Sequence, residues 1–384
     1  MSFIIWNVDP QIVSFLVVRW YGLLFAMGFI VSQQILYYVY RKEGKDEKDI
    51  DTLTIYVIIA TIIGARLGHV FFYEPHMILE RPLEIFSPIR FYPEFKIVGL
   101  QGLASHGGGI GILIAIWLYS RYDITFKKWK FKAPKIKRKG QSYLQILDRV
   151  AIVVAITACF IRFGNLMNSE IVGKPTDAGH GIIFARNVTE SLTRSDSPIE
   201  EISYSKREGD VSEQGYRPIN LQLSFKNGYD EAKVRGYIEG HFKKMITSYS
   251  YITDNIYQDP SAPVNYSLEQ KRGQFIAQVK VSGVARHPAQ LYESISSVLL
   301  FLILFIVWNK HKENTTPGRL FGIFLTVLFG LRFLYEFLKE NQVDFEDNLP
   351  LNMGQWLSIP MIIAGIIILI RSFSSKAVQE QLKE

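Results

Sequence analysis

Residues 144–168 read LQILDRVAIVVAITACFIRFGNLMN, an apolar stretch long enough to cross a lipid bilayer as a single helix. Three polar side chains, Arg162, Asn165 and Asn168, lie at its far end. Because a charge in hydrocarbon costs several kcal/mol, an ionisable residue in a membrane span normally faces a partner or a ligand. The stretch therefore predicts a membrane helix that carries part of a polar site.

Six further stretches of about 20 apolar residues occur in the chain. With the first they occupy residues 14–40, 50–73, 101–121, 144–168, 286–308, 319–338 and 352–371. Of the 384 residues, 48% are hydrophobic and 21% are charged, and the mean hydropathy is +0.11. This mixture predicts an all-α polytopic membrane protein with seven transmembrane helices and a sizeable polar part.

The distribution of positive charge predicts the orientation of the chain. Basic residues are concentrated after the first, third, fifth and seventh stretches, most densely at 127–139. Because cytoplasmic loops carry an excess of lysine and arginine, the N-terminus is expected outside and the C-terminus in the cytoplasm. The basic segment is interpreted as this topology signal and not as a nucleic-acid site. The N-terminus lacks the basic region of a cleavable signal peptide.

The polar part of the chain is concentrated in one long insert, which lacks an apolar run and mixes charges of both signs. The expected domains are a membrane part at 1–171 and 286–384 and an extracytoplasmic head at 172–285, between spans four and five. Alternation at 220–225 and 274–281 predicts strands, and 229–245 is compatible with a helix. An α+β head is therefore predicted, with a partly disordered spacer as the alternative.

With this topology, the polar residues of the spans fall in the outer half of the membrane. The residues concerned are Tyr21, Arg66, His69, His106, Arg162, Arg286, Arg332 and Glu336. Arg162, for example, lies about 20 Å along its helix from Asp148, at about 1.5 Å per residue. Structural polar residues would not be expected to choose one leaflet so uniformly. We interpret the group as a site that opens to the outer leaflet and binds something anionic.

Several of these residues also have a purely structural interpretation. Arg332 and Glu336 are four residues apart on one helical face and could neutralise each other. Tyr21 could anchor the chain at the membrane interface, and His69 could be a satisfied structural histidine. Gly107 could serve close helix packing. Alternatively, its backbone N–H group near a helix N-terminus could receive an anionic head group.

His106 stands apart from these residues. It adjoins flexible glycines in the outer leaflet, and imidazole is the side chain best suited to proton transfer near neutral pH. His106 is therefore the candidate base. Cys159, the single cysteine, sits in an apolar run and is interpreted as a small hydrophobic residue.

Six segments, taken in chain order, resemble one protein family. Residues 161–173, IRFGNLMNSEIVG, resemble the signature of bacterial prolipoprotein diacylglyceryl transferases. The other family-like elements are WYG at 20–22, GARLG at 64–68, HGG at 106–108, RHPAQLYE at 286–293 and GLRFLYEF at 330–337. They run from the first span to the sixth, so the resemblance covers the membrane part and covers the head poorly.

The resemblance implies transfer of the diacylglyceryl group from phosphatidylglycerol to the lipobox cysteine of a preprolipoprotein, which forms a thioether and releases glycerol phosphate. It implies no cofactor and no metal. On this interpretation Arg162 and Arg332 offer bidentate donors to the phosphate ester. His106 would activate the thiol, because a thiol with a pKa of about 8.5 is only a few per cent thiolate at neutral pH.

The resemblance also implies a set of residues for lipid binding and orientation. These are Tyr21, Asn165, Asn168, Glu170, Gly173 and Glu336, and the predicted substrate site further includes Arg66, Gly107 and Arg286. The expected partners are phosphatidylglycerol and the signal peptides of preprolipoproteins, and the expected location is the bacterial plasma (inner) membrane.

Two places depart from the family pattern. Lys339 stands where the family usually has arginine, and NQVD at 341–344 replaces a compact ending. The best competing class is a binder or transporter of an anionic lipid, although the internal repeat typical of transporters is not visible. A third class, an assembly protein whose head binds partners, leaves His106, Arg162 and Arg332 unexplained.

Overall fold

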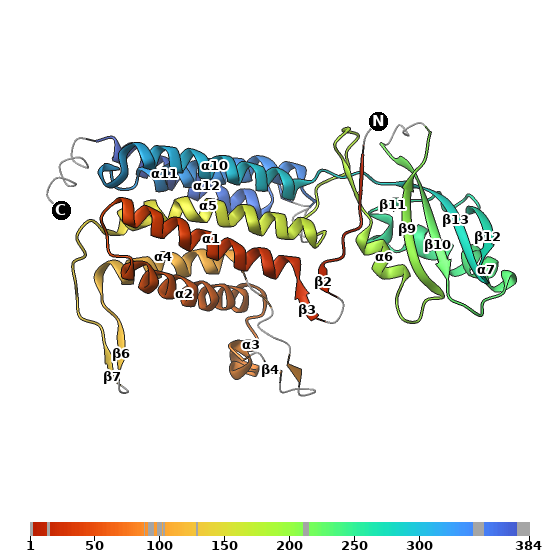
Figure 1. The fold of residues 1–384 in the computed structure, drawn as a ribbon, viewed down its shortest axis with the longest axis horizontal. Helices are drawn as coiled ribbons and strands as arrows, with labels where there is room; N and C mark the ends of the chain where they lie inside the picture. The colour runs from red at the N-terminus through yellow and green to blue at the C-terminus, as the bar shows by residue number, and fades with distance from the viewer. Residues whose placement is uncertain are drawn as a thin grey trace. The chain divides into compact units, whose positions relative to one another are not determined.

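The computed structural model describes residues 3–13, 16–87, 89–90, 96–97, 102, 104–127, 130–209, 215–340 and 349–374. Helices are present at each of the seven apolar stretches (Figure 1). They are α1 (Trp20–Lys42), α2 (Lys48–Tyr73), α4 (Ser105–Arg121), α5 (Tyr143–Met167), α10 (Ala289–His311), α11 (Arg319–Tyr335) and α12 (Met353–Ser372).

Six helices among the described residues are long and apolar enough to cross a membrane. Counted with the 3-10 turns that extend α10 to Asn314 and α11 to Leu338, they have 20 to 26 residues and mean hydropathies of 1.5 to 2.1, whereas α4 has 17 residues. Large apolar side chains are exposed along these helices, with Ile30, Ile306 and Ile370 at 60%, 66% and 65%. Side chains of this kind at such exposure suit contact with lipid. The chain is a polytopic membrane protein with a sheet-containing head.

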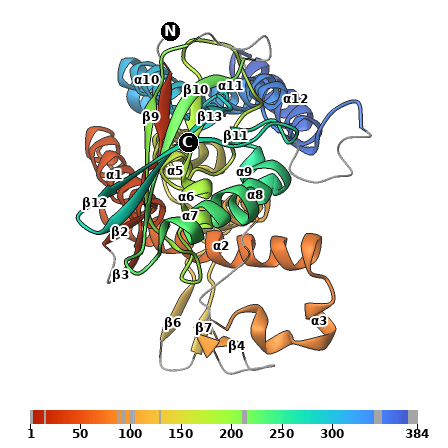
Figure 2. The ribbon, with the colours of Figure 1, turned by 90° about the vertical axis from the view of Figure 1, so that its right-hand side faces the viewer.

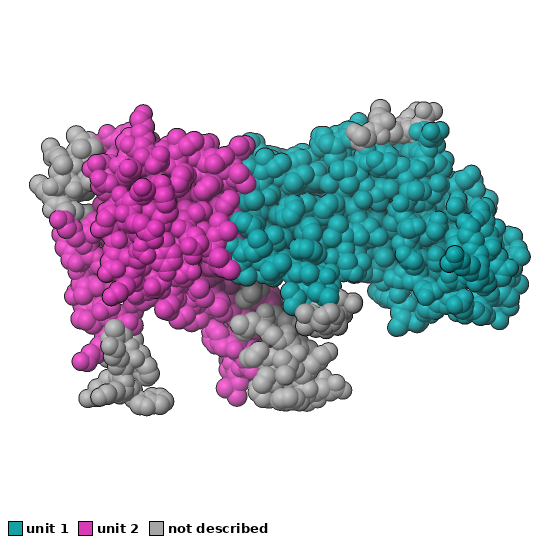
Figure 3. Space-filling model, viewed as in Figure 1, with its two compact units in different colours: residues 1–27, 158–296, 331–358 teal, residues 28–157, 297–330, 359–384 magenta. Residues whose placement is uncertain are grey.

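The chain forms two compact units, which Figure 3 shows in different colours. Unit 1 comprises residues 1–27, 158–296 and 331–358, and unit 2 comprises residues 28–157, 297–330 and 359–384. Unit 1 contains the whole of the long insert. α1, α5, α10, α11 and α12 contribute residues to both units.

The insert of unit 1 is an α+β structure, as predicted. Its elements are β8 (Ile182–Phe184), α6 (Arg186–Leu192), β9 (Ile199–Lys206), β10 (Arg217–Phe225), α7 (Glu231–Tyr237), a π-helical turn (Ile238–Phe242), α8 (Lys243–Ser248), α9 (Ser250–Thr253), β11 (Ile256–Tyr257), β12 (Asn265–Lys271) and β13 (Gln274–Gly283). Both predicted strands and the predicted helix are confirmed. The sheet is antiparallel in the order β11-β13-β10-β9, and β12 also pairs with β13.

The core of the head lies between this sheet and its helices, which Figure 2 shows beside the strands. Side chains alternate along β10, so that Leu221, Leu223 and Phe225 are fully buried on one face. They pack in one cluster with Val234 of α7 and Phe242 of the π-helical turn. Each such side chain contributes roughly 1.5–3 kcal/mol through burial.

The N-terminal segment of unit 1 forms strands before the first helix. β1 (Ile4–Trp6) pairs in parallel with β8, and β2 (Gln11–Val13) pairs with β3 (Leu16–Arg19) as a hairpin. The first helix therefore begins at Trp20, and the predicted start near residue 14 is wrong. Four of the six apolar residues at 11–19 are β-branched (Ile12, Val13, Val17 and Val18), and β-branched residues favour strands.

Unit 2 contains most of the long helices and several short elements. The short elements are α3 (Met77–Glu80), a 3-10 turn (Pro82–Ile85), β4 (Ile89–Arg90), β5 (Lys96–Ile97), β6 (Thr125–Lys127), β7 (Lys130–Lys132) and a second 3-10 turn (Lys312–Asn314). β6 and β7 form a hairpin after α4. This hairpin carries part of the basic segment that the sequence analysis interprets as a topology signal.

Glycines allow α2 and α4 to pack closely within unit 2. A Cβ atom added at Gly64 or at Gly107 would overlap the backbone carbonyl oxygen of the other residue, and one added at Gly68 would lie 2.8 Å from Gly107 Cα. Such close approach requires residues without side chains. The contacts of Gly107 are therefore those of close helix packing, which is the structural interpretation given above.

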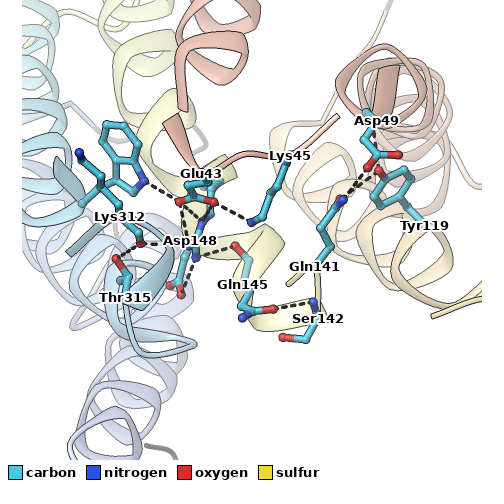
Figure 4. A network of polar contacts seen from close by, with 12 residues as sticks. Glu43, Lys45, Asp49, Tyr119, Gln141, Ser142, Gln145, Asp148, Lys312 and Thr315 are labelled. Carbon is cyan, nitrogen blue, oxygen red and sulfur yellow. Dashed lines mark hydrogen bonds and ion pairs between the residues drawn. The ribbon is translucent and has the colours of Figure 1, made fainter. Parts of the chain in front are cut away.

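A buried network of polar side chains connects the segment that follows α1 with α5 and α10 within unit 2 (Figure 4). Glu43 accepts hydrogen bonds from Arg149 Nε at 3.0 Å and from Trp308 Nε1 at 2.7 Å, and it pairs with Lys45 at 2.6 Å. The Glu43 and Arg149 side chains are 0% and 1% exposed. Burial alone would raise the pKa of Glu43, but Arg149 and Lys45 outweigh it and hold that pKa below its usual value.

Replacing Arg149 with Met should destabilise the protein by about 3–5 kcal/mol, because it leaves the Glu43 carboxylate buried without its main partner. The free energy of unfolding in detergent measures the effect. Arg41→Met is the matched control, since Arg41 forms an exposed pair with Glu47 at 2.8 Å, and exposed pairs contribute little. Equal stability of the two variants would contradict the prediction.

Candidate active site

The family-like signature lies at the end of α5 and in the loop that follows, within unit 1. Glu170 is the centre of this loop, because it accepts hydrogen bonds from Asn165 Nδ2 at 3.3 Å and from Asn168 Nδ2 at 3.0 Å. Ser169 and Ile171 on either side have φ angles of 54° and 56°. A β-branched residue rarely adopts this left-handed conformation, so the loop holds its shape against some backbone strain.

Arg162 is held by a carboxylate from a different helix. Its Nε atom pairs with Glu293 of α10, and its Nη1 atom lies 3.4 Å from Asn165 Oδ1. The side chain is 22% exposed, whereas Glu293 is 9% exposed. Arg162 therefore has a buried anchor at Nε and terminal nitrogens that are only partly engaged.

Arg332 has a similar arrangement on α11. Its Nε atom lies 3.6 Å from Glu336 Oε1, one turn further along the chain. Glu336 also pairs with Lys339 Nζ at 3.0 Å and accepts from Asn352 Nδ2 at 3.2 Å. The predicted contact between Arg332 and Glu336 is thus present, but Lys339 and Asn352 share the carboxylate.

The terminal nitrogens of the two arginines differ in their contacts. Within the described part of the chain, no hydrogen bond or ion pair engages the terminal nitrogens of Arg332. Arg162 and Arg332 are linked through Glu293, Lys339 and Glu336, which contact one another in series. Planar guanidinium groups with unengaged nitrogens can donate paired hydrogen bonds to a phosphate group.

Arg286, also in unit 1, has different contacts. Its guanidinium donates to the carbonyl oxygens of Asp254 at 2.8 Å and Gly173 at 3.3 Å, and it pairs with Glu340 at 2.6 Å. It is 5% exposed. These contacts favour a role in joining backbone segments, and the lipid-binding role of Arg286 stays a prediction.

Two glycines of the signature, Gly173 and Gly164, make close contacts with other segments of unit 1. A Cβ added at Gly173 would lie 2.5 Å from His287 O and 2.8 Å from Leu338 O, so only glycine fits between these segments. Tyr21, at the start of α1, packs on Gly164 of the signature, where an added Cβ would lie 3.0 Å from its ring. Tyr21 therefore does more than face the membrane interface, because it lies against the signature helix.

Three predicted site residues, Arg66, His106 and Gly107, lie in unit 2, whereas the other nine lie in unit 1. His106 and Gly107 occupy the first turn of α4. Arg66 is 6% exposed and donates to the carbonyl oxygens of Ile85 at 2.6 Å and Gly102 at 3.3 Å. These contacts indicate that Arg66 stabilises the loop that follows α2 through hydrogen bonds to its backbone.

Comparison with known sequences identifies the group of proteins that carries this pattern. The family model described as "Prolipoprotein diacylglyceryl transferase" matches residues 10–371. The chain belongs to this family.

Relatives within the family extend over nearly the whole chain. The "Phosphatidylglycerol--prolipoprotein diacylglyceryl transferase" of Bacteroides fragilis is 32% identical over 94% of this chain and 92% of its own length. Proteins of the same name from Tolumonas auensis and Chloroherpeton thalassium are 30% and 32% identical, each over 97% of this chain and over 98% and 95% of their own lengths. This family member is a bacterial multi-pass membrane protein.

Two residues of the arginine site were not predicted as members. Glu293 lies in a family-like segment but was not singled out, and its position inside an apolar span was the available signal. For Lys339, the sequence indicates only a departure from the family pattern. In the structure it is 3% exposed and pairs with two carboxylates. Residues 341–344, the other departure from the family pattern, lie outside the described residues.

Replacing Arg66 with Met should loosen the loop after α2 and leave the Michaelis constant for lipid within about threefold of wild type. Loss of the donors to Ile85 and Gly102 should cost about 1–3 kcal/mol locally. Hydrogen exchange of the amides at 77–85 measures the first effect, and kinetics measure the second. A tenfold weaker lipid affinity without faster exchange would instead support the predicted lipid-binding role.

Proposed function

We propose that this chain transfers the diacylglyceryl group of phosphatidylglycerol to the lipobox cysteine thiol of a preprolipoprotein, the first step of bacterial lipoprotein maturation. The observation that carries the proposal is the arginine pair. Arg162 pairs with Glu293 through Nε, and Arg332 Nε lies 3.6 Å from Glu336, which leaves terminal nitrogens of both arginines for a phosphate group. The names of the relatives, which cover nearly the whole chain, support the same reaction.

The reaction replaces a carbon–oxygen bond with a carbon–sulfur bond. The thiol gives up its proton, the sulfur attacks the glyceryl carbon of the lipid, and the bond from that carbon to the phosphate oxygen breaks. Glycerol phosphate leaves with the bonding electron pair. Because negative charge grows on this leaving group, cations already in place at Arg162 and Arg332 lower the barrier.

The remaining residues have supporting roles in the proposal. His106 accepts the thiol proton, because imidazole is the side chain best suited to proton transfer near neutral pH. Glu170 orients Asn165 and Asn168 toward the lipid head group. The proposed contributors to lipid binding and orientation are Tyr21, Gly107, Gly173 and Glu336.

The proposed topology has seven spans, with α4 as the third, in the bacterial inner membrane. The N-terminus and the head at 172–285 are placed outside, and the basic segment at 127–139 is placed in the cytoplasm. The proposed membrane domain is 1–171 with 286–384. The positive-inside pattern of the basic segments supports this orientation.

Cysteine labelling in intact spheroplasts should report this orientation. In a Cys159→Ser background, a cysteine at the exposed position Ser248 should react with a membrane-impermeant thiol reagent, whereas one at Ser142 should react only after lysis. The positive-inside rule gives the direction of this result. The reverse pattern would invert the proposed orientation.

A turnover assay tests the function directly. Purified full-length protein is mixed with phosphatidylglycerol and a lipobox peptide, and the release of glycerol phosphate and the mass of the peptide are measured. The proposal expects equal amounts of glycerol phosphate and diacylglyceryl peptide. Saturable lipid binding without either product would favour the alternative, a non-catalytic binder or transporter of an anionic lipid.

A further inference from the structure

Five charged side chains of unit 1 form a continuous series of ion pairs. Arg162 contacts Glu293, and Glu293 contacts the ammonium of Lys339. Lys339 Nζ lies 3.0 Å from Glu336 Oε1, and Arg332 Nε lies 3.6 Å from the same oxygen. Lys339 therefore joins the two carboxylates that hold the two arginines.

The centre of this series is buried and its two ends are more accessible. The Lys339 side chain is 4% exposed, and Glu293 and Glu336 are each 9% exposed, whereas Arg162 and Arg332 are 22% and 27% exposed. Carboxylates removed from water are costly unless they are paired. The ammonium therefore pairs with both buried carboxylates, and the arginines remain able to contact a ligand.

The backbone at Lys339 is fixed by the signature loop. Lys339 and Gly173 pair through an isolated antiparallel β-bridge, and Lys174 N donates a hydrogen bond to Leu338 O at 2.7 Å. Glu336 is confined as well, because a Cβ added at Gly354 would lie 2.6 Å from Glu336 Cδ. The backbone of Lys339 and the side chain of Glu336 are therefore fixed in position next to the residues of the signature.

We propose that Lys339 is a positioning residue, which determines how Glu293 and Glu336 hold the two arginines. The inference rests on the proposed function, in which Arg162 and Arg332 bind the lipid phosphate. With the ammonium present, Glu293 pairs with Arg162 through Nε, and Glu336 lies 3.6 Å from Arg332 Nε. Without it, each carboxylate gains by turning toward the terminal nitrogens of its arginine in a bidentate pair, and it then competes with phosphate.

The test measures glycerol phosphate release at varied phosphatidylglycerol concentrations for the full-length protein and its variants. In Lys339→Met, KM for the lipid should rise about 10-fold or more with a smaller change in kcat, and in Lys339→Arg it should stay within about threefold of wild type because the charge is retained. Lys45→Met is the matched control, since it removes a buried ammonium from Glu43 in unit 2. It should lower Tm and leave KM unchanged.

A double variant separates positioning from general damage. Adding Glu293→Gln to Lys339→Met removes one competing carboxylate, so KM should fall back toward the wild-type value. Lys339→Gln takes the place of Lys339→Met if the latter does not fold, and the same rise in KM is expected. An unchanged KM in Lys339→Met or Lys339→Gln, or no recovery of KM in the double variant, overturns the proposal.

Failure of the proposed function would be seen in the wild type, as an absence of glycerol phosphate release at any lipid concentration.

Discussion

Replacing Arg332 with Ala should reduce diacylglyceryl transfer at least ~100-fold, the usual scale for loss of one preorganised donor to developing negative charge. The terminal nitrogens of Arg332 have no partner among the described residues. Their removal therefore takes away contacts that a departing phosphate would gain. Arg162→Ala should have an effect of the same size, because its guanidinium is positioned by Glu293 and keeps terminal nitrogens for a phosphate group. Release of glycerol phosphate by purified variants measures both losses.

Lysine should rescue neither position well. Arg332→Lys keeps the charge but lacks the planar fork, so activity should stay about tenfold or more below wild type. Arg186→Ala is the control in the same unit, since Arg186 makes surface pairs with Asp9 and Glu190. Full activity of Arg162→Ala at normal expression would remove the arginine pair from the proposed site.

Sequence patterns predicted the helices and the head because both depend on local periodicity. Apolar runs of about 20 residues predict spanning helices wherever they occur, and alternation at 220–225 predicted β10. The start of α1 was missed for the same local reason. The segment before Trp20 continues the apolar run of the first span, and its pairing as a hairpin depends on contacts between two strands.

The contacts of the site could not be predicted in this way, because they join distant parts of the chain. Arg66, Arg162, Arg286 and Arg332 are the same residue type in the same predicted half of the membrane. Arg66 and Arg286 donate to backbone carbonyls, whereas Arg162 and Arg332 pair with carboxylates through Nε. The pairing of Lys339 with Glu293 of α10 likewise depends on how the helices of unit 1 pack.

Replacing His106 with Gln should leave phosphatidylglycerol binding nearly normal and slow turnover at least ~100-fold, the usual scale for loss of a general base. Glutamine retains a hydrogen-bonding side chain of moderate size but cannot accept a proton near neutral pH. If the missing step is activation of the thiol, raising the pH toward the thiol pKa of about 8.5 should restore part of the rate, because more thiolate then forms unaided. Lipid binding and turnover across a pH series measure the two effects.

His69→Gln provides the matched control for this substitution. His69 lies in the same unit, pairs with Glu74 at 3.4 Å and stacks on Tyr73, so the same change there should leave turnover and its pH dependence close to wild type. If His106→Gln instead loses lipid binding and gains nothing at alkaline pH, His106 contacts the head group. In that case the thiol proton must go to another acceptor, and the arginine pair would still account for stabilisation of the leaving phosphate.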